Sequence, residues 1–130
     1  MASIEAQQES PIRALVTWLV DDAVSPETAP VFLELWAMAT HNPQVAAGLA
    51  QLYDNAVEVC MKSLGVSVQA EKARRLRDSL YVLGTVLEGS SSIFFNRDRE
   101  NGLYTGVRRE AIEMLVPYLE QRLAEARDGA

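Results

Sequence analysis

The sequence predicts an all-α protein, an antiparallel bundle of about five main helices. Along most of the chain, apolar residues recur at spacings of three and four, which is the period of a helix with one buried face. Ser10-Pro11 and Asn42-Pro43 each place an N-cap residue directly before a proline, which is a typical helix start. No four-residue stretch alternates cleanly between apolar and polar residues with turn residues at its ends, so no strand is expected.

The first two helices are expected over about 11–22 and 28–41. Ile12, Val16 and Leu19 form one stripe on the first helix, and Ser25-Pro-Glu then interrupts the helical pattern. The second helix is apolar nearly all round, with Glu34 as the exception. Because such a helix has no clearly solvent-facing side, we expect it to be buried on more than one face.

The third helix is expected to begin at Pro43 and to end at Gly65, since glycine commonly follows a helix end. It carries two neighbouring apolar lines. The first line consists of Val45, Leu49, Leu52, Ala56, Val59 and Ser63. The second consists of Tyr53, Val57, Met61 and Leu64. A simple bundle needs only one line, so the second line suggests that this helix separates the core from a pocket.

The last two helices are expected over about 68–88 and 105–127, with the run Gly89-Ser-Ser-Ser between them read as an interruption. The earlier helix has a heptad-like leucine seam, and the later one has an apolar arc wider than one core requires. Uncovered leucines are rare on a monomer. We therefore predict a homodimer interface formed by Leu76, Leu80, Leu83, Gly84, Leu87, Ile112, Leu115 and Leu119.

Length and composition indicate one domain, over residues 10–128, after a flexible N-terminal segment over 1–9. The 130 residues include 18 acidic and 12 basic ones, for a net charge of −6. DNA affinity comes mostly from basic side chains, so no DNA binding is expected from this chain alone. Cys60 is the only cysteine, and neither a secretory leader nor a membrane-spanning run is evident. We therefore expect a cytoplasmic protein without a membrane role.

The chain does not offer the residues of an active site or a metal site. His41 is the only histidine, and its place at a helix end favours a structural role. Glu34 and His41 are two turns apart, which is not the spacing that brings two ligands to one metal. Cys60 faces the apolar side of its helix and is expected to act as a small hydrophobic residue. We expect no enzymatic activity, no metal and no cofactor.

Aromatic residues mark the predicted pocket instead. Core packing explains any one of them as well as a pocket does, but pockets between bundle helices are typically apolar with a few orienting polar groups. The apolar and aromatic candidates are Trp18, Phe32, Trp36, Tyr53, Val57, Cys60, Met61 and Tyr81. Asn55 and Glu88 are the candidate polar groups. The acidic N-terminal half slightly favours a cationic ligand, because aromatic faces and carboxylates both attract cations.

Five motifs occur in an order that resembles the C-terminal, effector-binding domain of TetR-type transcriptional regulators. They are Ser10-Pro11, Phe-Leu-Glu-Leu-Trp-Ala at 32–37, Asn42-Pro43 with an Ala-rich helix, the segment 80–89, and Leu-Val-Pro-Tyr-Leu at 115–119. The resemblance implies that the last two long helices pair with their copies in a dimer, and that the preceding helices enclose an effector pocket. It also implies an N-terminal helix-turn-helix for DNA, for which the nine residues before Ser10 are too few.

We therefore expect a homodimeric, ligand-sensing domain of a TetR-like regulator, a repressor or an activator, that binds an apolar or aromatic small molecule. The alternative is a helical homodimerisation or adaptor module without a small-molecule ligand. An internal cavity distinguishes the two expectations, because only a ligand-sensing domain needs one.

Overall fold

The structure, a computed structural model, describes residues 10–97, 100 and 102–128, and all regular structure in these residues is helical. The predicted all-α fold class is thereby confirmed. The elements are α2 (Pro11–Ala23), α3 (Ala29–Ala39), α4 (Pro43–Ser63), the 3₁₀-helix η1 (Glu71–Ala73), α5 (Arg74–Phe94) and α6 (Leu103–Arg127). The N-terminal segment 1–9, expected to be flexible, lies outside the described residues.

The two predicted cap-plus-proline starts are confirmed. The Ser10 hydroxyl accepts a hydrogen bond from the Arg13 amide at 3.0 Å, in the first turn of α2. The Asn42 side-chain oxygen accepts from the amides of Gln44 and Val45 at 3.0 and 3.2 Å, at the start of α4. Each cap satisfies helix amides that would otherwise lack a partner. These starts were predictable because they depend on a few neighbouring residues.

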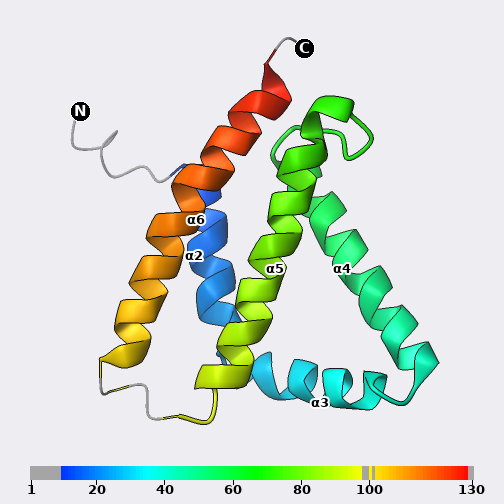
Figure 1. The fold of residues 1–130 in the computed structure, drawn as a ribbon, viewed down its shortest axis with the longest axis vertical. Helices are drawn as coiled ribbons and strands as arrows, with labels where there is room; N and C mark the ends of the chain where they lie inside the picture. The colour runs from blue at the N-terminus through cyan, green and yellow to red at the C-terminus, as the bar shows by residue number, and fades with distance from the viewer. Residues whose placement is uncertain (1–9, 98–99, 101, 129–130) are drawn as a thin grey trace.

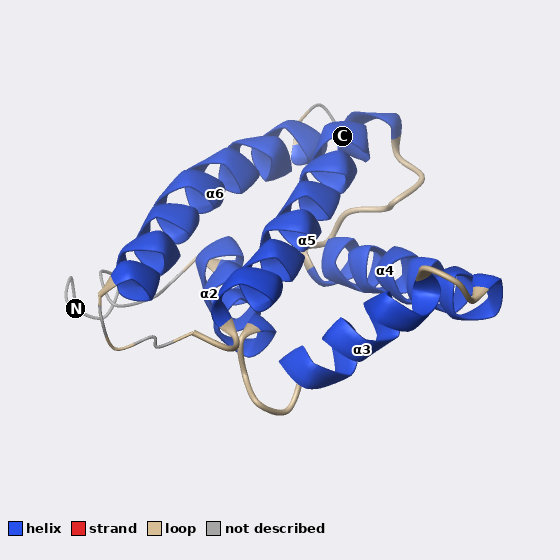
Figure 2. Ribbon diagram, turned by 60° about the horizontal axis from the view of Figure 1, so that its bottom comes forward, coloured by secondary structure: helices blue, strands red, loops and turns tan. Residues whose placement is uncertain are grey.

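The helices form two groups that share α5 (Figure 1). On one side α2, α5 and α6 pack along one another, while on the other side α3 and α4 complete a triangle with α5. In Figure 1, α3 runs along the base of this triangle, from the end of α5 to the end of α4, and Figure 2 turns this base toward the viewer. The triangle leaves space between α4 and α5 that their side chains must fill or line.

The apolar core lies between α2, α5 and α6 and continues to the end of α4. Its fully buried members include Ile12 and Val16 of α2, Met61 of α4, and Leu119 of α6. The leucine seam of α5 also belongs to this core, with Leu76, Leu80 and Leu83 at most 4% exposed. The seam packs against helices of its own chain.

Most of the residues predicted to form the dimer interface therefore pack inside their own chain and are not exposed to a second copy. Besides the three buried seam leucines, Ile112 and Leu119 are buried, and Leu87 and Leu115 pack against the core. Gly84 faces Tyr53, since a Cβ added to it would lie 3.7 Å from that ring. The physical reason is that α2 and α6 of the same chain cover the leucine stripe. The sequence pattern does not distinguish a covering helix of the same chain from one of a second copy.

α5 also extends beyond the predicted end of its helix. The expected break at Gly89-Ser-Ser-Ser does not occur, and the helix continues to Phe94. Ser91 is buried there, and its hydroxyl donates to the carbonyl of Ala23 at the end of α2 and, at 3.2 Å, to that of Leu87. This tertiary contact explains a helix through residues of low helix propensity.

α3 is more exposed than its composition predicts. Ala29 is its only buried residue, whereas Val31, Trp36 and Met38 are all at least 40% exposed. The expectation of burial on more than one side is wrong, because α3 packs against α4 and α5 and, among the described helices, none covers its other side.

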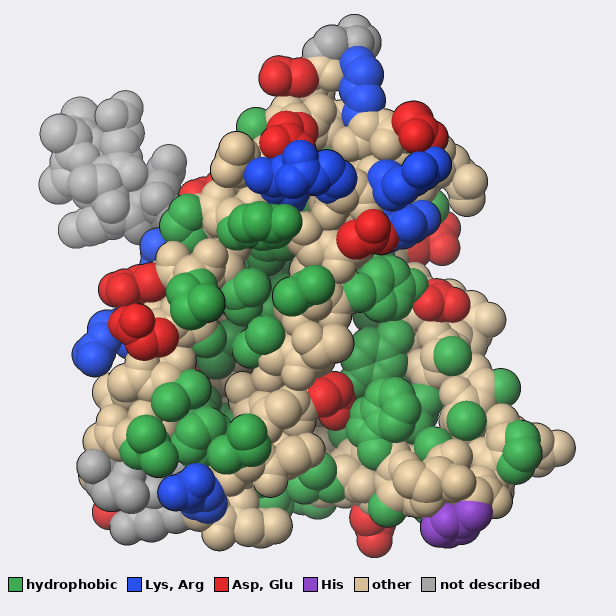
Figure 3. Space-filling model, viewed as in Figure 1, with side chains coloured by type: hydrophobic (Ala, Val, Ile, Leu, Met, Phe, Trp, Pro, Cys, Tyr) green, Lys and Arg blue, Asp and Glu red, His purple; other side chains and the backbone are tan. Residues whose placement is uncertain are grey.

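α5 and α6 carry a second, exposed apolar surface. We call it the α5–α6 face, and it consists of Val82, Ile93, Val107, Met114 and Tyr118. Its members recur every four, seven or eleven residues, so they form one stripe on each helix. At 3.6 residues per turn, the stripe on α5 lies about 120° from the buried seam. Figure 3 shows hydrophobic side chains gathered over these two helices.

Candidate functional site

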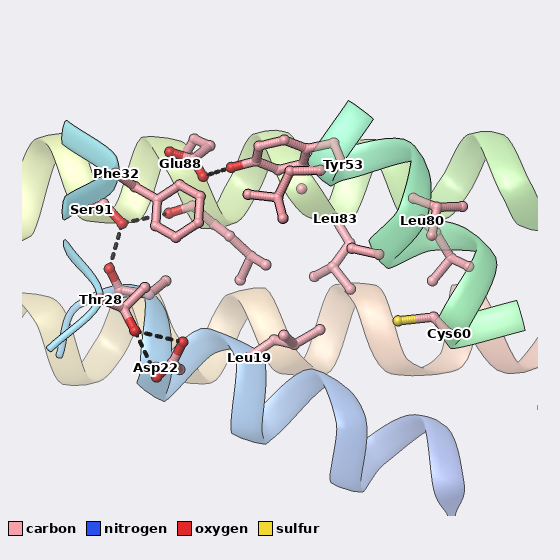
Figure 4. A pocket seen from close by; sticks show the side chains of 16 residues that line it. Leu19, Asp22, Thr28, Phe32, Tyr53, Cys60, Leu80, Leu83, Glu88 and Ser91 are labelled. Carbon is pink, nitrogen blue, oxygen red and sulfur yellow. Dashed lines mark hydrogen bonds between the residues drawn. The ribbon is translucent and has the colours of Figure 1, made fainter. Parts of the chain in front are cut away.

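An apolar hollow that is partly open to the surface lies between α2, α3, α4 and α5 and has a volume of about 270 Å³. We call it the inner hollow, and Figure 4 shows it from close by. Leu19 of α2, Phe32 of α3, Val57 and Cys60 of α4, and Leu83 of α5 contribute to its apolar lining. Its polar lining residues are Asp22, Thr28, Tyr53, Glu88 and Ser91. A few polar groups in an otherwise apolar lining are typical of a small-molecule site.

A second, more open hollow of about 560 Å³ lies between α3, α4 and α5. We call it the outer hollow. Trp36, Tyr53 and Tyr81 give it an aromatic lining, and Asp54 and Glu88 give it two carboxylates. The Tyr81 hydroxyl donates to Asp54 at 2.5 Å, and this bond is the main reason that the pKa of Tyr81 is raised.

The two hollows meet at Tyr53, Gly84 and Glu88, which line both. The Tyr53 hydroxyl donates a hydrogen bond to the Glu88 carboxylate, so that the ring spans from α4 to α5 (Figure 4). The ring also contacts Phe32 edge-on, at a centroid distance of 6.4 Å, and Trp36 at 5.8 Å. The ring also lies against α5 at Gly84, where an added Cβ would be 3.7 Å from it, at ordinary van der Waals distance.

The electrostatics of the site are set by carboxylates. Burial raises the pKa of Glu88, and hydrogen bonding from the Trp36 side chain partly opposes this rise. At the other end of the inner hollow, the Thr28 hydroxyl lies 3.0 Å from both carboxylate oxygens of Asp22. No Lys, Arg or His is among the described residues that line either hollow. The arrangement therefore has no group to neutralise an anionic ligand.

The structure brings most of the predicted pocket residues together. Phe32, Val57 and Cys60 line the inner hollow, Trp36 and Tyr81 line the outer one, and Tyr53 and Glu88 line both. Burial raises the pKa of the Cys60 thiol, so the neutral thiol contributes to an apolar lining. The second apolar line of α4 was the signal that identified Tyr53 and Val57.

Three predicted pocket residues lie elsewhere. Trp18 is 63% exposed and lines neither hollow, because α2 turns its other face to the core. Met61 is completely buried in the core at the end of α4. Asn55 is exposed and accepts a hydrogen bond from Gln51 at 2.9 Å, one turn back on the same helix. A helical wheel gives their directions but not the position of the neighbouring helices.

Sequence reasoning missed several lining residues. Asp22, Thr28 and Ser91 have no apolar periodicity, and the fold brings them together across about 70 residues of chain. Leu80, Leu83 and Leu87 were assigned to a dimer interface, although they line the inner hollow as well as packing in the core. The segment Ser25-Pro-Glu, which turns the chain between α2 and α3, was the only local signal near Asp22 and Thr28.

The surroundings of His41 favour a structural role, as the sequence predicts. His41 lies just beyond α3, where its Nδ1 is 2.8 Å from the Thr40 hydroxyl. Among the described residues, no group of three or more His, Cys, Asp or Glu side chains is arranged to hold a metal ion. Within that part of the chain, no helix combines the length and apolarity needed to cross a bilayer.

The described residues form an all-α domain with an apolar hollow between its helices, which is consistent with the C-terminal domain of a TetR-type regulator. Residues 9–84 match the family described as BetI-type transcriptional repressor, C-terminal, and the chain belongs to this family. The predicted relationship is thereby confirmed. The comparisons with curated proteins and with solved structures gave no match. The match covers α2 to the middle of α5, and hence most of the residues that line the two hollows.

Proposed function

We propose that the chain is the effector-sensing domain of a transcriptional repressor, and that an apolar or aromatic small molecule binds in the inner hollow. Membership in a family of repressor C-terminal domains supports the regulatory role. The observation that carries the ligand is the hollow itself, whose lining is predominantly apolar and comes from four different helices. The lining carboxylates favour a neutral or cationic ligand over an anionic one.

The domain acts as a homodimer in this proposal, through the α5–α6 face. The support is the contiguous exposure of Val82, Ile93 and Met114, which are each more than 50% exposed. An apolar patch of this kind is typical of a protein interface. The proposed interface lies on the same two helices that the sequence predicts, but it uses their exposed residues instead of their buried ones.

The regulatory step is a shift between two arrangements of the helices. A ligand that binds one arrangement more tightly increases its population, which changes the spacing of the DNA-reading heads of the full regulator. The net charge of −6 supports assigning DNA contact to such heads rather than to this domain. The assigned role needs no catalytic step, and it places the domain in the cytoplasm, where DNA and effector are both present.

Binding of the uncharged aromatic probe N-phenyl-1-naphthylamine tests the ligand site. We expect probe emission to rise on binding, and the melting temperature to rise with probe concentration by mass action. Trp36 lines the outer hollow and contacts Tyr53, so its emission should change as the probe binds. Trp36→Phe should remove this change in tryptophan emission.

Trp18→Phe is the matched control, because Trp18 is exposed and lines neither hollow. This variant should keep the response. Saturable binding with these two outcomes supports a ligand-sensing domain. If the probe neither binds nor raises the melting temperature, the ligand proposal fails, and the adaptor module becomes the better account of an exposed apolar face without an effector.

A further inference from the structure

We infer that Tyr53 is a specificity-determining partition that divides one continuous ligand site into two chambers and so sets the length of ligand that binds. This inference rests on the proposed ligand-binding function and adds a size limit to it. Tyr53, Gly84 and Glu88 are the three residues shared by the inner and outer hollows. Only one of them, Tyr53, has a side chain that reaches across from α4 to α5.

The position of the Tyr53 ring is fixed from several directions. Its hydroxyl donates to Glu88 on α5, and its ring packs against the rings of Phe32 and Trp36 on α3. Gly84 of α5 lies beside the ring, since a Cβ added there would be 3.7 Å from it. A side chain with contacts to two other helices loses most of its rotamer freedom, so it can act as a fixed end wall rather than a mobile ring.

The volumes of the two hollows show how much the Tyr53 ring can limit the size of a ligand. The inner hollow has a volume of about 270 Å³, which is slightly less than the range typical of sites for drug-sized ligands. The outer hollow adds about 560 Å³ directly beyond the ring. With Tyr53 in place, the inner hollow accepts only a short ligand. Without the Tyr53 side chain, a longer ligand can extend from the inner hollow into the outer one, between α4 and α5. One side chain thus decides between short and long ligands.

A homologous series of straight-chain primary alcohols measures this length, because its members are neutral and differ only in methylenes. Each alcohol competes with N-phenyl-1-naphthylamine for the full chain. While the added methylenes are still being buried, affinity should rise about fourfold for each one. In the wild-type protein we expect the rise to stop at the chain length that fills the inner hollow.

In Tyr53→Ala the rise should continue over several further carbons, because the outer hollow then accepts the end of the chain. Tyr81→Ala is the matched control. It removes a tyrosine that also donates to a carboxylate, yet Tyr81 lines only the outer hollow, so the chain length at the stop should not change. Circular dichroism and thermal unfolding establish that each variant is folded.

Tyr53→Phe keeps the ring and its packing and therefore tests the partition even if Tyr53→Ala does not fold. It removes only the hydroxyl that bonds Glu88. Alcohols longer than the wild-type stop should then bind about fivefold more tightly, which is the worth of one hydrogen bond that they no longer break. Shorter alcohols should bind as they do to the wild-type protein.

The outcomes separate the two proposals. If neither the probe nor any alcohol binds the folded wild-type protein, the proposed function fails and the partition fails with it. The partition alone is overturned if they bind but the wild-type protein shows no stop, or the stop stays at the same length in folded Tyr53→Ala. It is also overturned if alcohols longer than the wild-type stop gain no affinity in Tyr53→Phe. The same result follows if Tyr81→Ala moves the stop as far as Tyr53→Ala does.

Discussion

At the scale of single residues, Glu88 lines both hollows and also makes the stability of the fold depend on pH. Its carboxylate accepts from Tyr53 and lines both hollows, yet most of its surroundings are apolar. Removing water from a carboxylate disfavours the charged form, which is why burial raises the pKa of Glu88. A carboxyl whose pKa is raised on folding binds protons more readily in the native state than in the unfolded chain.

The sign of the pH dependence follows from this difference. The native state holds the Glu88 proton to higher pH than the unfolded chain, so the contribution of Glu88 to stability falls as pH rises from its usual pKa of 4.5 through the raised value. We predict that Glu88→Gln, which keeps an acceptor for Tyr53, is more stable than the wild-type protein at pH 7. The advantage should disappear below pH 4.5. Chemical denaturation across this range measures it.

Glu113→Gln is the control for a carboxylate lost from an exposed position of α6. Across the same pH range, the free energy of unfolding of Glu113→Gln should change with pH as that of the wild-type protein does, apart from a small constant difference. Equal pH profiles for the wild-type protein and Glu88→Gln would contradict the view that Glu88 is desolvated in the native state.

At the scale of elements, the last turns of α5 depend on one contact to α2. Ser91 and Ser92 are neighbours in a run of three serines, but Ser91 is buried and Ser92 is exposed. The Ser91 hydroxyl donates to the carbonyl of Ala23, at the C-terminal end of α2. A carbonyl at a helix end has no partner within its own helix, so this bond satisfies a group that burial would otherwise make costly.

We predict that Ser91→Ala lowers the free energy of unfolding by about 1 to 2 kcal/mol, because the Ala23 carbonyl loses its donor. Urea denaturation measures the change. Ser92→Ala, the same substitution one position along, should shift stability by at most about 0.5 kcal/mol. Equal effects in the two variants would mean that the contact between α5 and α2 contributes nothing to stability.

The elements also show what the sequence could predict and what it could not. The starts at Ser10 and Asn42 were predictable because a cap involves residues two or three apart. The end of α5 was not, because the bond that extends the helix joins Ser91 to a carbonyl 68 residues away. The leucine seam of α5 packs against α2 and α6, whose residues are distant from the seam in the sequence. The seam alone therefore does not indicate which helices cover it.

The site divides in the same way. Tyr53 and Val57 were predictable, since an extra apolar line on one helix indicates a second surface to cover. Asp22 and Thr28 were not, since each becomes a lining residue only when the chain turns between α2 and α3. Periodicity identifies which residues share a face, whereas the fold decides what that face meets.

At the scale of the whole molecule, the α5–α6 face is an exposed apolar surface that the packing of one chain does not explain. Its stripes lie on two neighbouring helices and are directed away from the core that α2 covers. Placing an arginine there should not disturb the fold, because the side chains already contact water.

We predict that Val82→Arg converts the protein from a dimer to a monomer without unfolding it. Val82 is 54% exposed on α5, so the arginine needs no space inside the chain, but it opposes a second copy at an apolar interface. Light scattering should give about twice the chain mass of 14.4 kDa for the wild-type protein and the single-chain mass for the variant.

Val59→Arg provides the comparison, since Val59 is 64% exposed on α4 and lies outside the α5–α6 face. This variant should remain a dimer. A wild-type protein that is monomeric at micromolar concentration would contradict the proposed dimer. Loss of the dimer in both variants would place the interface elsewhere on the molecule.

α5 borders the inner and outer hollows with one side and carries part of the α5–α6 face with another. A ligand and a second copy of the chain would therefore act on the same rigid body. Their binding free energies are then linked, and the linkage is reciprocal. If a ligand tightens the dimer tenfold, dimerisation must tighten the ligand tenfold, so the effector concentration to which such a protein responds would itself depend on how much of the protein is present.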